Sequence, residues 1–563
     1  MFYDDGVSFL LDSGTTPPDR HLHGACFCGV DLVIGADGAE RYLADPGRTL
    51  VPGEDGHYIL LTRSGASEWT LGTDFKGFSH LYWFNDENYW VVSNSLDRLR
   101  KAMSANGVAV APNLGELAAF ASVPWFARSV STFETSTVGV RLLGSHECLR
   151  ITADPSGALT ITTVPLSTVV PDSDSGPTDY LTGLGEFLSI WSGRFRTLFS
   201  DRDMTFFCDI SGGVDSRTVL SVALPVIREL NPRVRYYSPP GMVADFAVAQ
   251  EVATASGITL NHTTPAEQAE FIARRERFGR ALTAGERFGF WRDSHLGSYV
   301  HVTFPMRTQA KSFEMKIGGL GGEAHRHAYL PVMHEGSMEE AAETWRSHFT
   351  RPELFEQWRS SVLAADETLA ALPGTHPNPM VRHHREFRDR FHSGSAGFWI
   401  LATEALSSRH LARCSSLLDP EPFADGQVLS DIVYNSIPEL LILPYDLPEK
   451  SLSGKAVRRL RSIPGGWDPL PAGEIYGGAP GPDVPLPGDE EFDTPLEFLL
   501  DEARRSIAGD RDLMDAVGLS NATESLLELE KMVSARAGNM AAQNLHSNGT
   551  QAHLLSLAAS FRP

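Results

Sequence analysis

One short turn constrains the fold of this chain more than any other feature. Residues 206–224 read FFCDISGGVDSRTVLSVAL, in which an apolar run ends on two serines that enclose a glycine pair and an aspartate. The run before Ser211 is typical of a buried β-strand, and the apolar spacing after Val214 is typical of a helix. Glycines permit backbone angles closed to other residues, so amide groups can approach a ligand closely. Because the helix would direct its N-terminus at the same turn, the pattern predicts an anion site, with phosphate as its usual ligand.

The polar side chains of the turn refine this prediction. Ser211 and Ser216 add hydroxyl donors, whereas Asp215 would repel a phosphate unless a cation lay between them. We therefore expect Mg²⁺ beside Asp215. No Gly-Lys-Ser/Thr follows, so the turn is not a Walker A loop. The alternative is a structural strand-to-helix turn with a capping aspartate.

Composition and charge exclude several classes of protein. The 563 residues suggest two or three domains, and a net charge of -23 argues against nucleic acid or an anionic membrane as the main partner. The acidic start lacks the basic region of a signal peptide, and no apolar run is long enough to span a bilayer. The 5 cysteines are few and odd in number, so we expect a cytoplasmic protein without a disulfide framework.

The pattern of apolar residues divides the chain into three parts. Residues 1–168 carry short runs of β-branched and aromatic residues between turns, which predict a β-rich domain. In residues 180–470 strand-like and helix-like segments alternate, which predicts an α/β domain with a parallel sheet and helical additions. Residues 462–493 are rich in Pro and Gly and form either an active-site lid or a disordered linker. The last part, residues 471–563, continues from this loop into a helical tail.

The turn resembles the pyrophosphate-binding loop of the ATP-pyrophosphatase (PP-loop) superfamily, in its asparagine synthetase branch. Three later segments resemble that branch in the same order. Residues 245–257, DFAVAQEVATASG, match its D-x-x-x-A-x-x-V-A helix from Asp245 onward. Residues 317–329, IGGLGGEAHRHAY, resemble its Gly-x-Gly-Ser-Asp-Glu segment, with Glu323 in the place of the second metal-binding aspartate. Residues 453–461, SGKAVRRLR, resemble its Lys-x-x-Leu-Arg element, although Arg458 stands where leucine is expected.

This resemblance implies a role for each matching residue. It assigns Lys455 to catalysis and Asp215 and Glu323 to Mg²⁺. The residues that it assigns to ATP are Ser211, Gly212, Gly213, Asp215, Ser216, Ser238 and Gly319. Residues 73–83, TDFKGFSHLYW, also resemble a strand pair of the branch's glutaminase domain. The implied fold is α/β, with a glutaminase-like (Ntn-type αββα) domain followed by an ATP-pyrophosphatase (adenine nucleotide α-hydrolase-like) domain.

The first domain departs from the family pattern. Glutamine-dependent members carry a nucleophilic cysteine after the start methionine, where this chain has Phe2. Cys28-Gly29-Val30 imitates the nucleophile's surroundings, but removal of the preceding segment would be needed to free an α-amine. A metal cluster of His21, His23, Cys26 and Cys28 is a second interpretation, and their alternation favours a plain strand. We therefore expect a degenerate domain that produces no ammonia.

The remaining residues imply an ATP-dependent ligase that uses another amine. Such an enzyme forms an acyl-adenylate, and an amine then displaces AMP. Gly321-Gly322-Glu323 followed by Arg326 is most similar to lasso-peptide macrolactam cyclases, which join a peptide's Asp or Glu side chain to its α-amine. Leu320 stands where β-lactam synthetases carry a basic tyrosine and asparagine synthetases a glutamate. The missing base could be the substrate, water or a residue that the sequence does not identify; His325 and Glu404 are candidates, and a structural role is favoured for each.

Three functions stay open at this stage. The first is the macrolactam cyclase, whose partners would be a peptide substrate, a leader peptidase and a leader-binding protein. The second is a β-lactam synthetase-like or ammonia-dependent enzyme that acts on a small-molecule carboxylate. The third is an inactive scaffold that binds a peptide. None of the three requires nucleic acid or a membrane.

Overall fold

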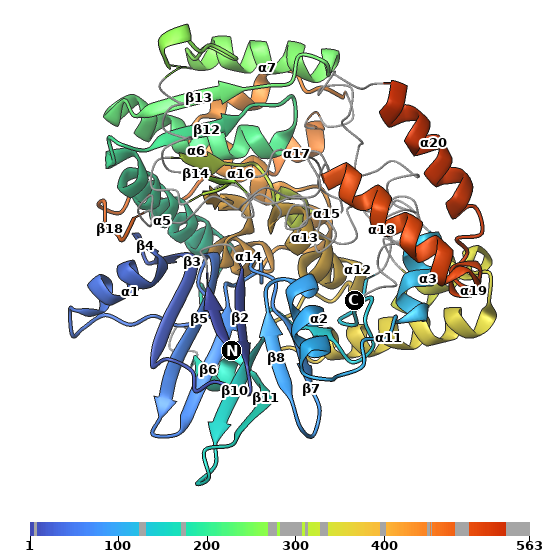
Figure 1. Ribbon diagram of the computed structural model, residues 1–563. Helices are drawn as coiled ribbons and strands as arrows, with labels where there is room; N and C mark the ends of the chain where they lie inside the picture. The colour runs from blue at the N-terminus through green and yellow to red at the C-terminus, as the bar shows by residue number, and fades with distance from the viewer. Residues whose placement is uncertain are drawn as a thin grey trace.

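The computed structural model shows a mixed α/β protein in which a β-rich N-terminal region adjoins a parallel sheet (Figure 1). The described residues are 1–4, 8–122, 131–170, 176–267, 269, 279–281, 307–309, 314–326, 336–394, 401–447, 451, 453–478 and 495–535. The predicted β-rich start and the predicted parallel sheet are both confirmed.

Two sheets make up the N-terminal region. The smaller sheet has the order β1 (Phe2–Asp4), β2 (Phe9–Asp12), β8 (Trp90–Ser93), β7 (Tyr82–Asn85) and β9 (Arg141–Leu142). The larger sheet has the order β11 (Leu159–Pro165), β10 (Glu147–Ala153), β6 (Glu68–Thr73), β5 (Gly56–Gly65), β3 (Arg20–Cys28), β4 (Asp31–Ile34) and β18 (Ile475–Tyr476). All these pairs are antiparallel except β4 with β18.

Strand alternation places these sheets in the middle of four layers. Phe9 and Leu11 of β2 share one core with Ile59 and Leu61 of β5, so the two sheets face each other. The alternate residues of the same strands point away from this core. There α1 (Gly35–Leu43) covers the larger sheet and α2 (Leu96–Ala105) covers the smaller one. The helix–sheet–sheet–helix order agrees with the expected layers at this coarse level.

Among the described residues, every helix falls short of the length and apolar character that crossing a membrane requires.

The sheet that follows the N-terminal region in the sequence is parallel. Its order is β13 (Arg233–Tyr237), β12 (Thr205–Asp209), β16 (Glu314–Ile317) and β17 (Leu401–Thr403). Its core packs against α5 (Tyr180–Ser200) and α6 (Val214–Leu230). The chain runs from β12 to β13 on one side and continues into β16 and β17 on the other. The loops after β12 and β16 therefore diverge at the point where the strand order reverses, which is where open α/β sheets bind ligands.

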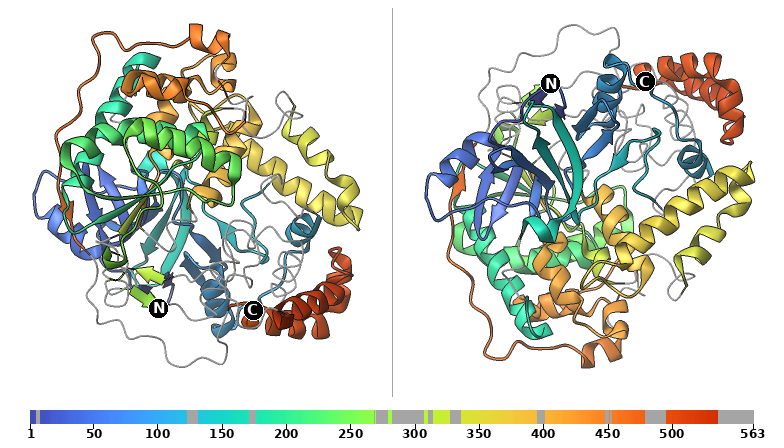
Figure 2. Two further views of the ribbon diagram at one scale, coloured as in Figure 1. Left: turned by 90° about the horizontal axis from the view of Figure 1, so that it is seen from above. Right: turned by 90° about the horizontal axis from the view of Figure 1, so that it is seen from below.

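Most of the described chain between β16 and β17 is helical, as predicted for the middle of the chain. The helices include α10 (Met338–Glu343), α11 (Pro352–Ala370), α12 (Pro379–His383) and α13 (Asp389–Gly394). The tail forms α18 (Pro495–Gly509), α19 (Arg511–Ala516) and α20 (Ala522–Ala535). Figure 2 shows these tail helices beside α3 (Leu114–Ser122) and α11, and Thr350 Oγ1 donates a hydrogen bond of 2.9 Å to the Ala516 carbonyl.

One part of the Pro- and Gly-rich stretch, residues 462–493, forms a strand. Residues 475–476 form β18, which adds to the edge of the N-terminal sheet through β4. Arg48 and Tyr476 join the two segments by a hydrogen bond, and the guanidinium lies 4.8 Å from the ring centroid. The segment that includes β18 therefore belongs with the first domain rather than with a separate tail. The rest of the segment predicted to be a lid or a linker, residues 479–493, lies outside the described part of the chain.

Candidate functional site at the carboxyl edge of the parallel sheet

The predicted turn joins β12 to α6, and its two serines close it. The Ser211 amide donates a hydrogen bond of 3.1 Å to Ser216 Oγ, and the two hydroxyl oxygens lie 2.7 Å apart. The Gly213 amide donates to Ser211 Oγ over 3.2 Å. Both hydroxyls predicted to face a phosphate therefore also hold the turn in its present shape.

Gly212 is fixed from two sides. Its amide donates a hydrogen bond of 2.8 Å to Asp245 Oδ1, from α7 (Val243–Ser256), and its carbonyl accepts one of 3.3 Å from the Asp446 amide. A Cβ atom at Gly212 would lie 2.7 Å from the Cβ of Asp446, so no larger residue fits. In this conformation, Asp245 takes the amide that the sequence pattern would offer to an anion.

A second glycine-rich loop, after β16, touches the first turn of α6. A Cβ atom at Gly319 would lie 2.6 Å from the Ser216 amide nitrogen. A Cβ atom at Gly322 would lie 2.2 Å from Asp215 Oδ1. Glycine is required at position 319, where the neighbour is backbone, whereas a larger residue at position 322 would displace the Asp215 carboxylate. The two segments predicted to bind ATP are thus brought together.

The two predicted metal ligands lie near each other. Burial raises the pKa of Glu323 to about 7; the Arg388 guanidinium lowers it, and the neighbouring Asp215 raises it further. Arg326 Nη2 donates a hydrogen bond of 2.8 Å to Asp215 Oδ2. A pair of carboxylates suits Mg²⁺, which commonly takes its other ligands from substrate phosphates and water. The donor set fits this ion, and Arg326 would compete with it for Asp215.

Lys455 lies apart from this pair. It belongs to the short helix α17 (Gly454–Arg458), forms an ion pair with Glu421 of α15 (Pro420–Ala424) and is 59% exposed. In the described part of the chain, no hydrogen bond or ion pair joins it to Asp215 or Glu323. The predicted catalytic lysine is therefore not brought into contact with the predicted metal ligands in this conformation.

Ser238 follows β13 at the same edge of the sheet. Its amide donates a hydrogen bond of 3.0 Å to Asn261 Oδ1, and its carbonyl accepts one of 2.8 Å from Asn261 Nδ2. The side chain is fully buried, and its hydroxyl has no hydrogen-bond partner among the described residues. The structure places this residue one strand away from the turn at Ser211, as the sequence order requires.

Arg217 is a positioning residue that the sequence did not reveal. Its buried guanidinium donates hydrogen bonds to the carbonyls of Leu440, Leu443 and Pro444. It also lies 3.9 Å from the ring centroid of Tyr445. Arg217 therefore ties this segment to α6, next to the contact between residue 446 and Gly212. Its partners lie more than 200 residues away, so no local pattern could identify them.

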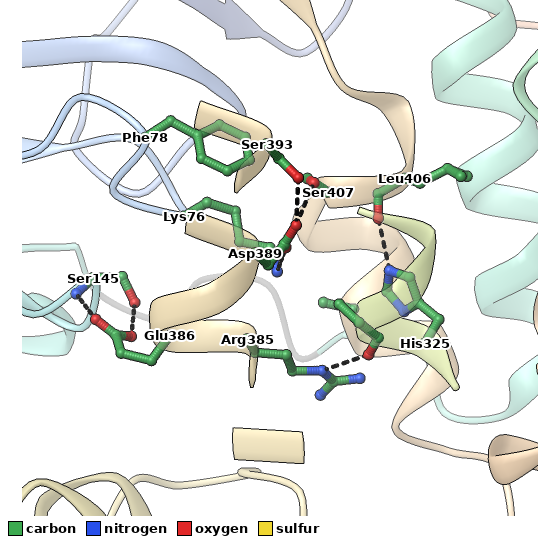
Figure 3. A network of polar contacts seen from close by, with 12 residues as sticks. Lys76, Phe78, Ser145, His325, Arg385, Glu386, Asp389, Ser393, Leu406 and Ser407 are labelled. Carbon is green, nitrogen blue, oxygen red and sulfur yellow. Dashed lines mark hydrogen bonds and ion pairs between the residues drawn. The ribbon is translucent and has the colours of Figure 1, made fainter. Parts of the chain in front are cut away.

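His325 has a structural role, as favoured from the sequence. Its Nε2 donates a hydrogen bond of 2.7 Å to the Leu406 carbonyl, and its Nδ1 accepts one of 2.8 Å from Ser415 Oγ (Figure 3). Burial lowers the pKa of His325 well below its usual value, so the ring is neutral. With both nitrogens engaged, it has no lone pair left to accept a proton from a substrate.

A buried network links the loop after β6 to this site. Figure 3 shows Lys76 and Asp389 pointing toward each other, with Nζ 2.7 Å from Oδ2. Asp389 also accepts hydrogen bonds from the hydroxyls of Ser393 and Ser407. A Cβ atom at Gly321 would lie 2.1 Å from Ser407 Oγ, so Ser407 sits directly against the loop that carries Glu323.

The N-terminal residues give no second site. Phe2 of β1 packs on the rings of Phe9 of β2 and His21 of β3. His21 and His23 both contact Asp4, whereas the sulfurs of Cys26 and Cys28 lie 3.9 Å apart as a separate pair. No group of three or more potential metal ligands occurs among the described residues. The strand interpretation of residues 20–28 is confirmed.

Comparison of the sequence with models of known protein families and with curated proteins finds no match. The roles of the residues at this edge of the sheet therefore rest on their chemistry and their placement.

Proposed function

We propose that this protein is an ATP-dependent amide-bond ligase that releases AMP and pyrophosphate. One observation carries the proposal, namely the contact between the two glycine-rich loops where the strand order of the parallel sheet reverses. This contact sets Asp215 and Glu323 beside the first turn of α6, whose amides favour anions. Phosphates, two carboxylates and a divalent cation form a consistent set of partners.

The residues of the site would divide the chemistry between them. The turn from Ser211 to Ser216 would hold the pyrophosphate half of ATP, which requires Asp245 to share or release the Gly212 amide. Asp215 and Glu323 would hold Mg²⁺, which neutralises charge on the departing pyrophosphate when it is bound. Lys455 would leave Glu421 and place its charge beside the acyl group. Its exposure and its flexible four-carbon stem make such a movement inexpensive in free energy.

For the substrate, we propose a peptide whose Asp or Glu side chain is joined to its own α-amine in a lasso-type macrolactam. The glycine pair before Glu323 and the nearby Arg326 support this choice over a small substrate. Such an enzyme would act in the cytoplasm on a precursor handled by a leader-binding protein and a leader peptidase. AMP-forming activation of a small carboxylate is the second candidate, because it needs the same loops.

Pyrophosphate exchange into ATP tests the activation step. We expect exchange with a linear peptide that has a free α-amine and an Asp or Glu side chain, and a product lighter by one water. Asp215→Ala should abolish exchange, whereas Asp37→Ala, on the exposed face of α1, should leave it unchanged. Exchange with free aspartate or glutamate but with no peptide would select the second candidate. No exchange together with no ATP binding would refute the ligase and favour the scaffold.

A further inference from the structure

A small cavity lies between the larger N-terminal sheet, α5 and the end of β17. It has room for about one molecule the size of water. The residues that line it are Phe27, Asp55, Gly56, His57, Asp74, Phe75, Lys76, Phe78, Trp191, Ala402, Thr403, Glu404 and Ser407. They come from both halves of the protein, so the cavity exists only where the halves meet.

Several buried polar atoms lining this cavity have no hydrogen-bond partner among the described residues. They are His57 Nε2, Trp191 Nε1 and Thr403 Oγ1, and beside them lies the buried carboxyl of Glu404, which the Leu320 amide approaches. Each of these side chains is at least nine-tenths buried. Buried polar atoms are normally paired, because an unpaired one destabilises the fold. Three such atoms and a buried carboxyl around one cavity indicate a site for a small polar group.

Glu404 lies beside the glycine-rich loop that touches the phosphate turn. It directly follows β17, and the Gly318 amide donates a hydrogen bond of 3.3 Å to the Thr403 carbonyl across the strand ends. A Cβ atom at Gly318 would lie 2.4 Å from Glu404 Oε2, so the carboxyl rests against that glycine. The next residue, Gly319, touches the Ser216 amide. The carboxyl is thus separated from the proposed ATP site by a single loop.

We propose that Glu404 is the base that accepts a proton from the amine nucleophile, whose nitrogen enters this cavity. The inference rests on the proposed function and names the missing proton acceptor. In the step, the Glu404 carboxylate takes a proton from the substrate's ammonium group, and the lone pair that this frees attacks the acyl carbon of the acyl-adenylate. The second N–H proton passes to water, and the carbon–oxygen bond to AMP breaks with its electron pair leaving on the phosphate. The products are the amide, AMP and a protonated Glu404, which returns its proton to solvent.

The surroundings of Glu404 suit this role. Burial raises its pKa well above the usual value, Lys316 opposes the shift, and Asp209 and Asp389 add to it. A carboxylate of raised pKa is a stronger base toward an amine than an exposed one. The cavity brings four more titratable groups near it, which are Asp55, His57, Asp74 and Lys76. Burial lowers the pKa of His57 to about 4, so that ring stays neutral beside the carboxylate.

Two nucleophiles of different basicity test the assignment in the full-length protein. Methylamine is mostly charged at neutral pH and needs a base, whereas hydroxylamine is mostly uncharged and needs none. Using the carboxylate that gives the exchange signal, we would compare exchange, methylamide and hydroxamate formation in wild type and Glu404→Gln. We expect exchange and hydroxamate within about 3-fold of wild type and methylamide reduced by about 100-fold or more. The wild-type rate of methylamide formation should rise with pH as Glu404 loses its proton, and Glu404→Gln should lack this part of the rise.

Glu386→Gln is the matched control, because Glu386 is equally buried and bonded to Ser145 and Arg390 in the same polar region. It should leave the ratio of methylamide to hydroxamate unchanged. A wild-type ratio in Glu404→Gln, or a common fall of all three signals, would overturn the proposal and leave Glu404 a structural role. Absence of exchange in the wild type would instead refute the ligase itself, and with it this inference.

Discussion

The buried ion pair between Lys76 and Asp389 carries a specific prediction about stability. Their side chains are 6% and 2% exposed, with Nζ 2.7 Å from Oδ2, so water screens their attraction little. Lys76→Met keeps most of the side-chain volume, removes the cation and leaves the Asp389 charge buried. We expect this variant to be less stable than wild type at neutral pH, because a buried charge without its partner is strongly unfavourable.

Two considerations set the size of the effect. Breaking a buried pair from one side costs about 3–5 kcal/mol. Asp389 keeps its hydrogen bonds from the Ser393 and Ser407 hydroxyls, which favours the lower end of this range. Burial would raise the pKa of Asp389, but Lys76 and Ser393 lower it overall from 3.8 to about 2. At about 1.4 kcal/mol per pKa unit, this depression corresponds to roughly 2–3 kcal/mol of stabilisation. We therefore expect a loss of about 3 kcal/mol in the free energy of unfolding.

The same pKa shift fixes the direction of the pH dependence. The folded-state pKa of Asp389 lies below its unfolded value, so its charge stabilises the fold fully above about pH 4. This contribution is lost as the pH falls toward about 2, the folded-state value. The difference between wild type and Lys76→Met should therefore be largest at neutral pH and shrink in acid.

Urea unfolding followed by tryptophan fluorescence measures these differences. The comparison needs wild type, Lys76→Met, Asp389→Leu and the double variant, which lacks both charges of the pair. We expect the double variant to be more stable than either single variant. Lys101→Met breaks the exposed helix pair with Asp97 and should cost less than about 0.5 kcal/mol. A Lys76→Met midpoint equal to that of Lys101→Met would refute the reasoning.

Three further substitutions probe the candidate site. Asp215→Asn should remove Mg²⁺-dependent pyrophosphate exchange with the urea midpoint nearly unchanged; retained exchange would place the metal elsewhere. Gly319→Ala sets a methyl group 2.6 Å from the Ser216 amide, so exchange should fall by about 10-fold or more. Gly241→Ala, which meets nothing within 4 Å, is its control, and equal activity of the two would contradict the loop contact. Arg217→Leu removes hydrogen bonds to three carbonyls and should cost about 3 kcal/mol on urea unfolding; a wild-type midpoint would show that those carbonyls find other partners.

The sequence predicted the parts of the site that local patterns determine. The strand, the glycine turn and the helix around Ser211 follow from apolar spacing and backbone freedom within one short segment. The approach of Gly319 to that turn was expected from a family resemblance, and the sheet order provides its physical reason. The placement of Lys455 on Glu421 could not be predicted, because an exposed lysine takes its partner from whatever tertiary neighbour lies in reach. The three carbonyls bound by Arg217 had no signal in the sequence, because they lie more than 200 residues away from it.

The N-terminal region was expected to be a structural relic, and the contacts across its boundary give that expectation a physical meaning. Asp55, at the edge of its larger sheet, pairs with buried Arg194 of α5 and accepts hydrogen bonds from Ser408 Oγ and the Arg409 amide. Lys76 neutralises Asp389 in the same interface.

Removing the region would take away the ion-pair partners of Arg194 and Asp389 and expose the surface that they share with it. It would also release the segment at Ser407 and Ser408, which packs against Gly321 in the loop that carries Glu323. The N-terminal region thus supports the neighbouring site through these contacts. On this view, the position of Glu323 depends on Lys76 even though the two side chains never touch.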